Sequence, residues 1–152
     1  PGVNLSGAAV VTVLDGGVLI GPSAGLRLSA QLAYEAAQIT GTSADDFWVL
    51  DGYDKVVRYL DGGVLDLTPS FAESRWSILV RPGDDVWLVG SRIRRYDGAG
   101  GWSEVVVTLP GPATDFRWRS VRELGSNQLG ISGLQVRPDG GLAPVFMRLA
   151  IP

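Results

Sequence analysis

The chain has 152 residues, enough for one ordinary hydrophobic core, and its 45% apolar and 19% charged residues, with 21 Gly and 9 Pro, favour short strands joined by many turns. It contains neither Cys nor His, which excludes disulfides, thiolate and imidazole metal sites, and Ser-His-Asp or Cys-His catalytic sets. The formal charge of −3 argues against a nucleic-acid partner bound by bulk electrostatics.

No segment of the sequence is typical of a membrane protein. No apolar run approaches the roughly 18 residues that a membrane span needs. The chain start lacks an initiator Met and the basic flank of a signal peptide. We therefore expect no membrane insertion and a chain cut from a longer precursor or processed, while the absence of Cys is compatible with either an extracellular or a cytoplasmic location.

The first half of the chain predicts strands around two Asp-Gly turns. "TVLDGGVL" contains a turn at Asp15, and "RYLDGGVL" contains one at Asp61. Between them, "LRLSAQLAY" alternates apolar and polar residues and predicts a strand, although residues 30–38 also include good helix formers. "ADDFWVLDG" then predicts a buried strand, and "RWSILV" at residues 75–80 predicts a strand that follows the second turn.

The second half repeats these patterns. "GDDVWLVGS" matches "ADDFWVLDG", so that Trp48 and Trp87 occupy the same column. Further Asp-Gly turns follow in "RRYDGAGGW" at Asp97 and "VRPDGGLA" at Asp139, giving spacings of 46, 36 and 42 residues between the four turns. Asp-Gly between strand-forming flanks predicts a tight hairpin, because Gly adopts positive φ freely and Asp tolerates it. Four hairpins at similar spacings along the chain predict structural repeats.

Each repeat is expected to contain a buried strand, a Gly-containing step, a second strand, the Asp-Gly turn and a returning strand. A fourth strand is expected after the first three turns, including "DFRWRSV" after the third, whereas the chain ends in "LAPVFMRLAIP" without one.

A unit of about 40 residues with four short strands and an Asp-Gly hairpin resembles a β-propeller blade. "GDDVWLVGSRIRRYDGAGGWSEV" resembles the degenerate blade repeats of bacterial propellers, which are WD40-like and kelch-like in architecture but lack those signature motifs. The resemblance implies an all-β propeller of about four four-stranded blades, as a four-bladed ring or part of a larger one. A β-sandwich or barrel of successive hairpins is the alternative.

The expected domain is a single propeller-like unit over residues 1–152. Its blades would span residues 1–40, 41–80, 81–124 and 125–152, with the outer strand missing from the last.

Two acidic pairs precede the buried strands, Asp45-Asp46 and Asp84-Asp85. They could bind Ca²⁺, contact a glycan or supply the carboxylates of a glycosidase. We favour a structural role in turns, because the pair recurs as a repeat feature. No cofactor is otherwise expected.

A second candidate surface combines arginines with aromatic residues. Seven arginines lie between Arg81 and Glu123, but six acidic residues share that segment, so its net charge is only +1 and a solvated, salt-bridged face is favoured. Trp48 and Trp87 are expected in the core. The candidate binding residues that remain are Trp76, Trp102, Arg94, Arg117, Trp118 and Arg119.

The sequence favours a non-catalytic propeller module for binding or assembly, because no convergent catalytic set is present. The expected partner is a protein, or a second copy joined through a blade edge. The alternatives are a glycan-binding propeller that uses Trp76 or Trp102, and a carboxylate-dependent glycoside hydrolase.

Overall fold

A computed structural model describes the backbone of residues 2–5, 9–14, 17–21, 27–31, 36–43, 45–51, 55–70, 74–98, 101–109 and 115–151. Side chains are described from Ala36 onward within these ranges, except that of Trp76. All regular elements in the described ranges are β-strands, so the fold is all-β, and none of them is a helix that could cross a membrane. The helix that residues 30–38 could have formed is absent where the chain is described, since β5 begins at Ala36.

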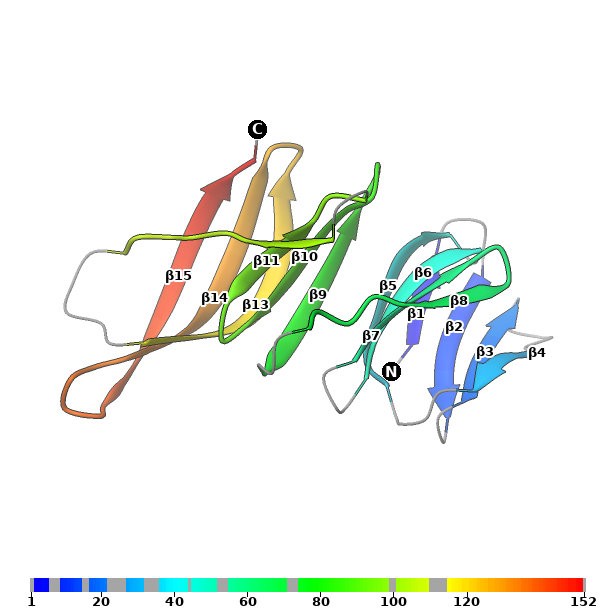
Figure 1. The fold of residues 1–152 in the computed structure, drawn as a ribbon, viewed down its shortest axis with the longest axis horizontal. Helices are drawn as coiled ribbons and strands as arrows, with labels where there is room; N and C mark the ends of the chain where they lie inside the picture. The colour runs from blue at the N-terminus through cyan, green and yellow to red at the C-terminus, as the bar shows by residue number, and fades with distance from the viewer. Residues whose placement is uncertain are drawn as a thin grey trace. The chain divides into compact units, whose positions relative to one another are not determined.

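The strands form four antiparallel sheets (Figure 1). The first contains β1 (Gly2–Leu5), β2 (Ala9–Leu14), β3 (Gly17–Gly21) and β4 (Arg27–Gln31), and the second contains β5 (Ala36–Ser43), β6 (Asp46–Asp51), β7 (Val56–Leu60) and β8 (Gly63–Asp66). The third contains β9 (Arg75–Arg81), β10 (Asp85–Gly90), β11 (Ile93–Tyr96) and β12 (Trp102–Glu104). The last has three strands, β13 (Asp115–Gly125), β14 (Gln128–Val136) and β15 (Leu142–Ala150).

In every sheet, strands that are consecutive in the sequence are hydrogen-bonded neighbours. This up-and-down order is the four-stranded blade pattern of a propeller. By residue contacts the chain divides into two compact units, residues 1–70 with 80–84, and residues 71–79 with 85–152. The expected single domain with its four blade boundaries stays a prediction.

The Asp61-Gly62 hairpin has the geometry that its sequence predicts. Leu60 pairs with Gly63, which leaves a two-residue connection between β7 and β8. Asp61 has φ 50° and Gly62 has φ 77°, the two positive values of a primed turn. Residues 15 and 16 lie outside the described residues.

The other Asp-Gly turns do not all occupy the same place in their sheets. In the second and third sheets the turn precedes the fourth strand, whereas in the last sheet it joins the second and third strands. The Asp139-Gly140 connection is longer than the expected two residues, because Val136 pairs with Leu142. The single column of Asp-Gly turns is therefore a sequence feature rather than one structural position.

Three further expectations about strands were wrong. Residues 75–81 and 115–125 do not close the preceding sheets but open the next ones as β9 and β13. The Gly-containing step expected in the last repeat is also missing, because β14 pairs with β15 along its whole length and with β13 on its other side. A Cβ at Gly133 would collide with the backbone of Arg117 and Trp118, so this glycine permits close strand approach rather than a turn.

Each unit has its own buried side chains. In the first unit, Trp48 is fully buried and Phe47 stacks on Tyr59 with ring centroids 4.6 Å apart. In the second unit, one face of the last sheet packs on β10 and β11, through a cluster of Trp87, Val89, Ile93, Trp118, Val121, Leu129, Ile131 and Ile151. The expectation that Trp48 and Trp87 are core residues is confirmed.

Candidate functional site

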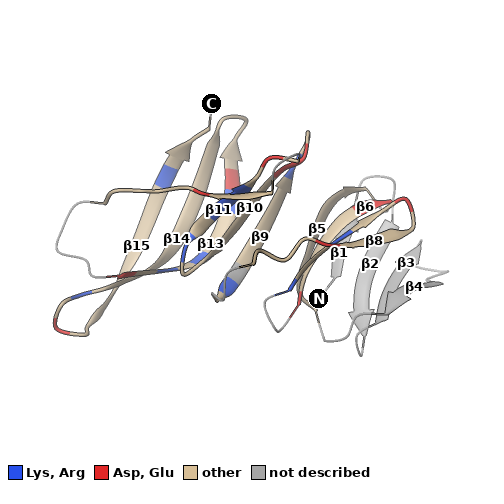
Figure 2. Cartoon of the chain, viewed as in Figure 1, with Lys and Arg blue, Asp and Glu red and all other residues tan. Residues whose placement is uncertain are grey.

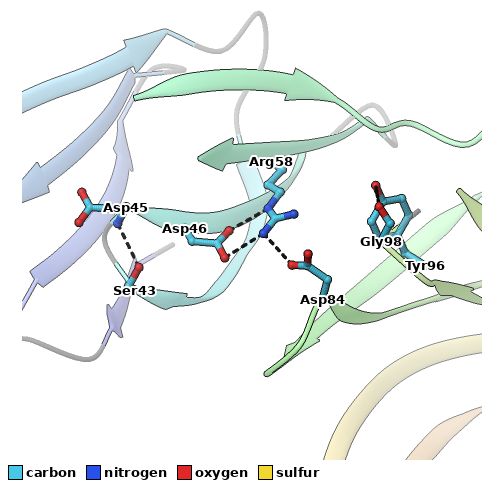
Figure 3. Close-up of polar contacts among 7 residues, drawn as sticks. All are labelled: Ser43, Asp45, Asp46, Arg58, Asp84, Tyr96 and Gly98. Atoms are coloured by element: carbon cyan, nitrogen blue, oxygen red, sulfur yellow. Dashed lines mark hydrogen bonds and ion pairs between the residues drawn. The ribbon is translucent and has the colours of Figure 1, made fainter. Parts of the chain in front are cut away.

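Arg58 lies at the centre of a charged cluster in the first unit (Figure 3). It stands on β7 directly opposite Trp48 of β6, and its guanidinium carbon lies 5.4 Å from the centroid of the indole ring. Asp46 is two residues before Trp48 and therefore lies on the same face of β6. The Arg58 Nε donates to Asp46 Oδ1 at 2.9 Å, and Nη2 donates to Oδ2 at 3.0 Å, which is a bidentate arrangement.

Asp84 adds a second carboxylate to this guanidinium. It follows Gly83 in the turn before β10, where Gly83 has φ 81° and Asp84 has φ 60°. Glycine adopts this conformation freely and aspartate tolerates it, so "PGDD" suits the turn. Arg58 Nη2 donates to Asp84 Oδ1 at 2.7 Å. We call Asp46, Trp48, Arg58 and Asp84 the Arg58 cluster.

Hydrogen bonding to Asp46 raises the pKa of Arg58 further above its already high ordinary value. The hydrogen bond to Asp84 and the negative charges of both carboxylates raise it too, and together they outweigh burial, which lowers it. The Arg58 side chain is only 10% exposed. A buried cation held by two anions is a satisfied structural ion pair, and it leaves little carboxylate capacity for an external ligand.

The second unit contains a similar arrangement. Arg95 on β11 lies opposite Trp87 on β10, with its guanidinium carbon 5.3 Å from the indole centroid. Its Nε donates to Asp85 Oδ1 at 2.7 Å. These three residues form the Arg95 cluster. Sequence reasoning treated such arginines as a solvated face, although the Arg-Tyr pair before the Asp-Gly turn, present in both "RYLDG" and "RYDG", was a usable signal.

The four candidate carboxylates therefore do not converge on an open site. Asp46, Asp84 and Asp85 each bond to an arginine, and Asp45 is exposed beside Ser43, whose Oγ accepts from the Asp45 backbone N–H at 3.3 Å. Across the described part of the chain, no three acidic side chains gather closely enough to hold a metal ion. The contacts of Asp46, Asp84 and Asp85 are ion pairs with arginines, which differ from the role in turns that the sequence favoured.

The candidate aromatic and arginine residues are dispersed. Trp118 is 2% exposed and Arg94 is 5% exposed. Both are therefore buried, although the sequence had placed them among the candidate binding residues. Trp102 is partly buried and packs against Tyr96, with ring centroids 5.4 Å apart. Arg117 and Arg119 are exposed. The side chain of Trp76 lies outside the described residues.

The last sheet has a second face, opposite its core face, that sequence reasoning missed. Directly paired residues lie on the same side of a sheet. The register aligns Leu142 with Val136, Pro144 with Leu134, and Phe146 with Ser132. It places three arginines on this same side, Arg117 and Arg122 of β13 and Arg148 of β15. Leu124 belongs to it too, because its side chain covers Gly130 there. We call this the outward face; its main residues are Arg117, Arg122, Leu124, Leu134, Val136, Leu142, Phe146 and Arg148.

The outward face is apolar and basic. Leu142 is 54% exposed, Phe146 51% and Leu124 40%. Three arginines of this face are also exposed, Arg117, Arg122 and Arg148. Asp115 lies on the same side, because it pairs with Val136. Figure 2 shows basic positions on both β13 and β15. Exposed large apolar residues bordered by charges are typical of a protein-contact surface.

A bulge in β13 changes which residues of that strand lie on each face of the sheet. The register shifts between Trp118 and Ser120, so Arg119 is the extra residue. This shift lets both Trp118 and Val121 point into the core while Arg117 and Arg122 remain on the outward face.

No protein-family model and no curated protein matches the sequence. Among solved structures, the chain is similar to the extracellular domain of a hybrid two-component system from B. thetaiotaomicron, with 11% identity, a TM-score of 0.67 and coverage of 99% of this chain and 22% of that one. It is also similar to YCF48 bound to a D1 peptide, with 11% identity, a TM-score of 0.64 and coverage of 93% and 51%. YCF48 from Cyanidioschyzon merolae gives 16% identity, a TM-score of 0.58 and coverage of 95% and 53%.

These structures have β-propeller-type folds, and the chain spans between about a fifth and about half of their length. At such low identity the likeness concerns the fold alone. The chain therefore has an all-β, propeller-type fold, as its repeats predict.

Proposed function

We propose that this chain is a non-catalytic protein-binding module of propeller type, and that it contacts its partner through the outward face of the last sheet. The observation that carries the proposal is the exposure of Leu142 and Phe146 beside Arg148 on one side of the last sheet. Large apolar side chains at such a surface provide binding energy, and arginines are enriched among residues that dominate protein interfaces. The YCF48 structure that resembles the chain holds a bound peptide, which supports a protein partner.

The contacts of the carboxylates support the absence of catalysis. A glycosidase needs one carboxylic acid and one carboxylate facing a substrate. Here Asp46 and Asp84 bond to the same guanidinium, and Asp85 bonds to Arg95. A glycan site built on these acids is disfavoured for the same reason, because their oxygens already accept hydrogen bonds.

A display selection tests the proposal. The chain is used to select binders from a random peptide library, and the affinities of the selected peptides are measured for the wild type and for Leu142→Asp/Phe146→Asp. We expect the substitutions to weaken binding by about tenfold or more, because buried apolar contacts become buried charges. The matched control is Val64→Asp/Leu65→Asp on β8, where the native residues are 56% and 47% exposed.

Equal far-UV circular dichroism and equal melting temperatures ensure that the variants are compared as folded proteins. Retained affinity in the outward-face variant, or loss only in the β8 variant, would place the contact elsewhere. Failure of the wild type to enrich any peptide would contradict a binding module, and specific hits on a glycan array with the wild type would favour the glycan alternative.

A further inference from the structure

The last sheet has one strand fewer than each of the other three. The first three sheets contain four strands, whereas β15 ends the last sheet, with β14 on one side and none of the other described strands on its far side. β15 spans nine residues, Leu142–Ala150, and pairs with β14 throughout. An edge of this kind is a template for another strand.

The hydrogen bonds at the two ends of β15 show which backbone groups remain available. Arg137 N–H donates to Gly141 C=O, and Ile151 N–H donates to Asn127 C=O, both at 2.9 Å. In an extended strand the N–H and C=O of one residue point to the same side, and successive residues alternate. The pairing of β14 and β15 has no register shift, so odd-numbered residues face β14 and even-numbered residues face the free edge.

Pro144 divides this edge into two parts. Proline has no N–H, so position 144 offers only its carbonyl to an incoming strand. Beyond it, Phe146, Arg148 and Ala150 each present both a donor and an acceptor at the edge. The segment 146–150 is therefore the part of β15 that can form a regular ladder with a new strand.

The same even-numbered residues carry the exposed side chains of the outward face. Phe146 is 51% exposed, and Arg148 is exposed next to it on that face. Arg122 lies in the same cross-strand row as Arg148, with Gly130 between them. A strand added at the edge would place its own side chains beside Phe146 and Arg148, where an apolar residue and an acidic residue fit in chemistry and charge.

We propose that the free edge of β15 binds an extended peptide segment as a fourth strand, with an acidic residue opposite Arg148 and apolar residues at the positions two before and two after it. This inference rests on the proposed function and adds the mode of binding and the chemistry of the partner. Main-chain hydrogen bonds supply affinity in such strand addition, and alternate side chains supply specificity.

The probe is a synthetic seven-residue peptide, Thr-Val-Thr-Glu-Thr-Val-Thr, carrying a fluorophore, and the readout is fluorescence anisotropy with the full chain. One version is N-methylated at Glu, whose N–H points toward β15 when Glu pairs with Arg148. The matched version is N-methylated at the neighbouring Thr, whose N–H points away. We expect about tenfold weaker binding for the first and less than about threefold change for the second.

The side-chain contribution is tested by charge reversal. Arg148→Glu should lose the Glu peptide and gain a peptide with Lys in its place, while Arg119→Glu, at the bulge of β13, should leave the preference for Glu unchanged. Position 148 is exposed on an edge strand, so the variant is expected to fold, and its melting temperature verifies this.

The outcomes separate the two proposals. If peptides from the display selection bind through the outward face but neither methylation nor Arg148→Glu changes their affinity or that of the probe, strand addition is wrong and the proposed function stands. If the wild type binds neither the probe nor any selected peptide, both fail. Concentration-dependent dimerisation that Phe146→Asp abolishes would identify a second copy as the occupant and overturn the peptide proposal.

Discussion

Replacing Arg58 by Met tests whether the Arg58 cluster is a structural element of the first unit. Methionine keeps an apolar side chain over Trp48 but removes the guanidinium. Three hydrogen bonds disappear, two to Asp46 at 2.9 and 3.0 Å and one to Asp84 at 2.7 Å. Asp46 is only 24% exposed and is left without its cation, whereas Asp84 is 46% exposed and regains water more easily.

These contacts set the expected size of the effect. Loss of the bidentate bond to Asp46 is worth about 2–3 kcal/mol, and the exposed pair with Asp84 adds up to about 1 kcal/mol. We therefore expect Arg58→Met to lower the free energy of unfolding by about 3 kcal/mol. Arg95→Met should lower it by about half as much, because Arg95 is 34% exposed and has one bond to Asp85.

Urea unfolding followed by tryptophan fluorescence and far-UV circular dichroism measures these differences, and coincident transitions check that unfolding is cooperative. Arg92→Met is the control, since Arg92 is 55% exposed in its pair with Glu104 and should contribute less than about 1 kcal/mol. If Arg58→Met costs no more than Arg92→Met, the cluster is not a structural element and its acids become available for a ligand role.

Burial raises the pKa of Tyr59 above its ordinary value of 10.0, so its contribution to stability is present below about pH 10 and is lost as the pH rises through the higher folded value. Tyr59→Phe should flatten this alkaline decline in urea unfolding, and an unchanged slope would contradict the burial argument. Gly90→Ala should lower the free energy of unfolding by about 2 kcal/mol, because the new Cβ would collide with the carbonyl of Ser74. Gly125→Ala is the control: there is open space around Gly125, so the change should be less than about 0.5 kcal/mol. Equal effects of the two substitutions in thermal melts would refute the steric explanation. Millimolar Ca²⁺ should give the same melting temperature as EDTA, because Asp46, Asp84 and Asp85 are paired with arginines. If Ca²⁺ raises the melting temperature and Asp84→Asn abolishes this increase, the calcium hypothesis is restored.

Features that depend on local chemistry were predictable from the sequence. The Asp61-Gly62 turn follows from the ability of these two residues to adopt positive φ, and the structure has both values. The burial of Trp48 and Trp87 follows from an aromatic residue at one column of a repeated apolar strand. Together these signals indicated an all-β repeat fold, and the solved propeller-type structures agree.

Features that depend on pairing between strands were not predictable in this way. "GISG" contains the glycines of a step, but β14 continues through them because both of its neighbours pair with it. Likewise, residues 115–125 have the composition of a closing strand, and only the hydrogen bonds with β14 show that they open a sheet. A periodic pattern identifies a strand but does not say which neighbour it pairs with.

The sites seen in the structure differ from those predicted by the sequence for the same reason. Arg58, Asp46 and Asp84 are far apart in the sequence and meet only through the register of β6 with β7 and the turn before β10. Trp118 was a candidate surface residue because arginines flank it in the sequence, but it pairs with Gly133 on the core side of the sheet and is 2% exposed. The outward face escaped notice because "LAPVFMRLA" has apolar residues on both sides of its strand, and only the sheet shows which side the core covers.

Amide hydrogen exchange of β15, measured by NMR with and without a selected peptide, tests most directly whether the chain binds a protein segment at its last sheet. In the free chain the amides of Met147 and Leu149, which face β14, should exchange slowly, and those of Phe146, Arg148 and Ala150 should exchange fast. Peptide binding should slow these three amides by about tenfold or more while the amides of β8 stay unchanged. If the peptide binds and the exchange of Phe146, Arg148 and Ala150 does not change, the peptide does not pair with the edge of β15, and the central claim of strand addition is contradicted.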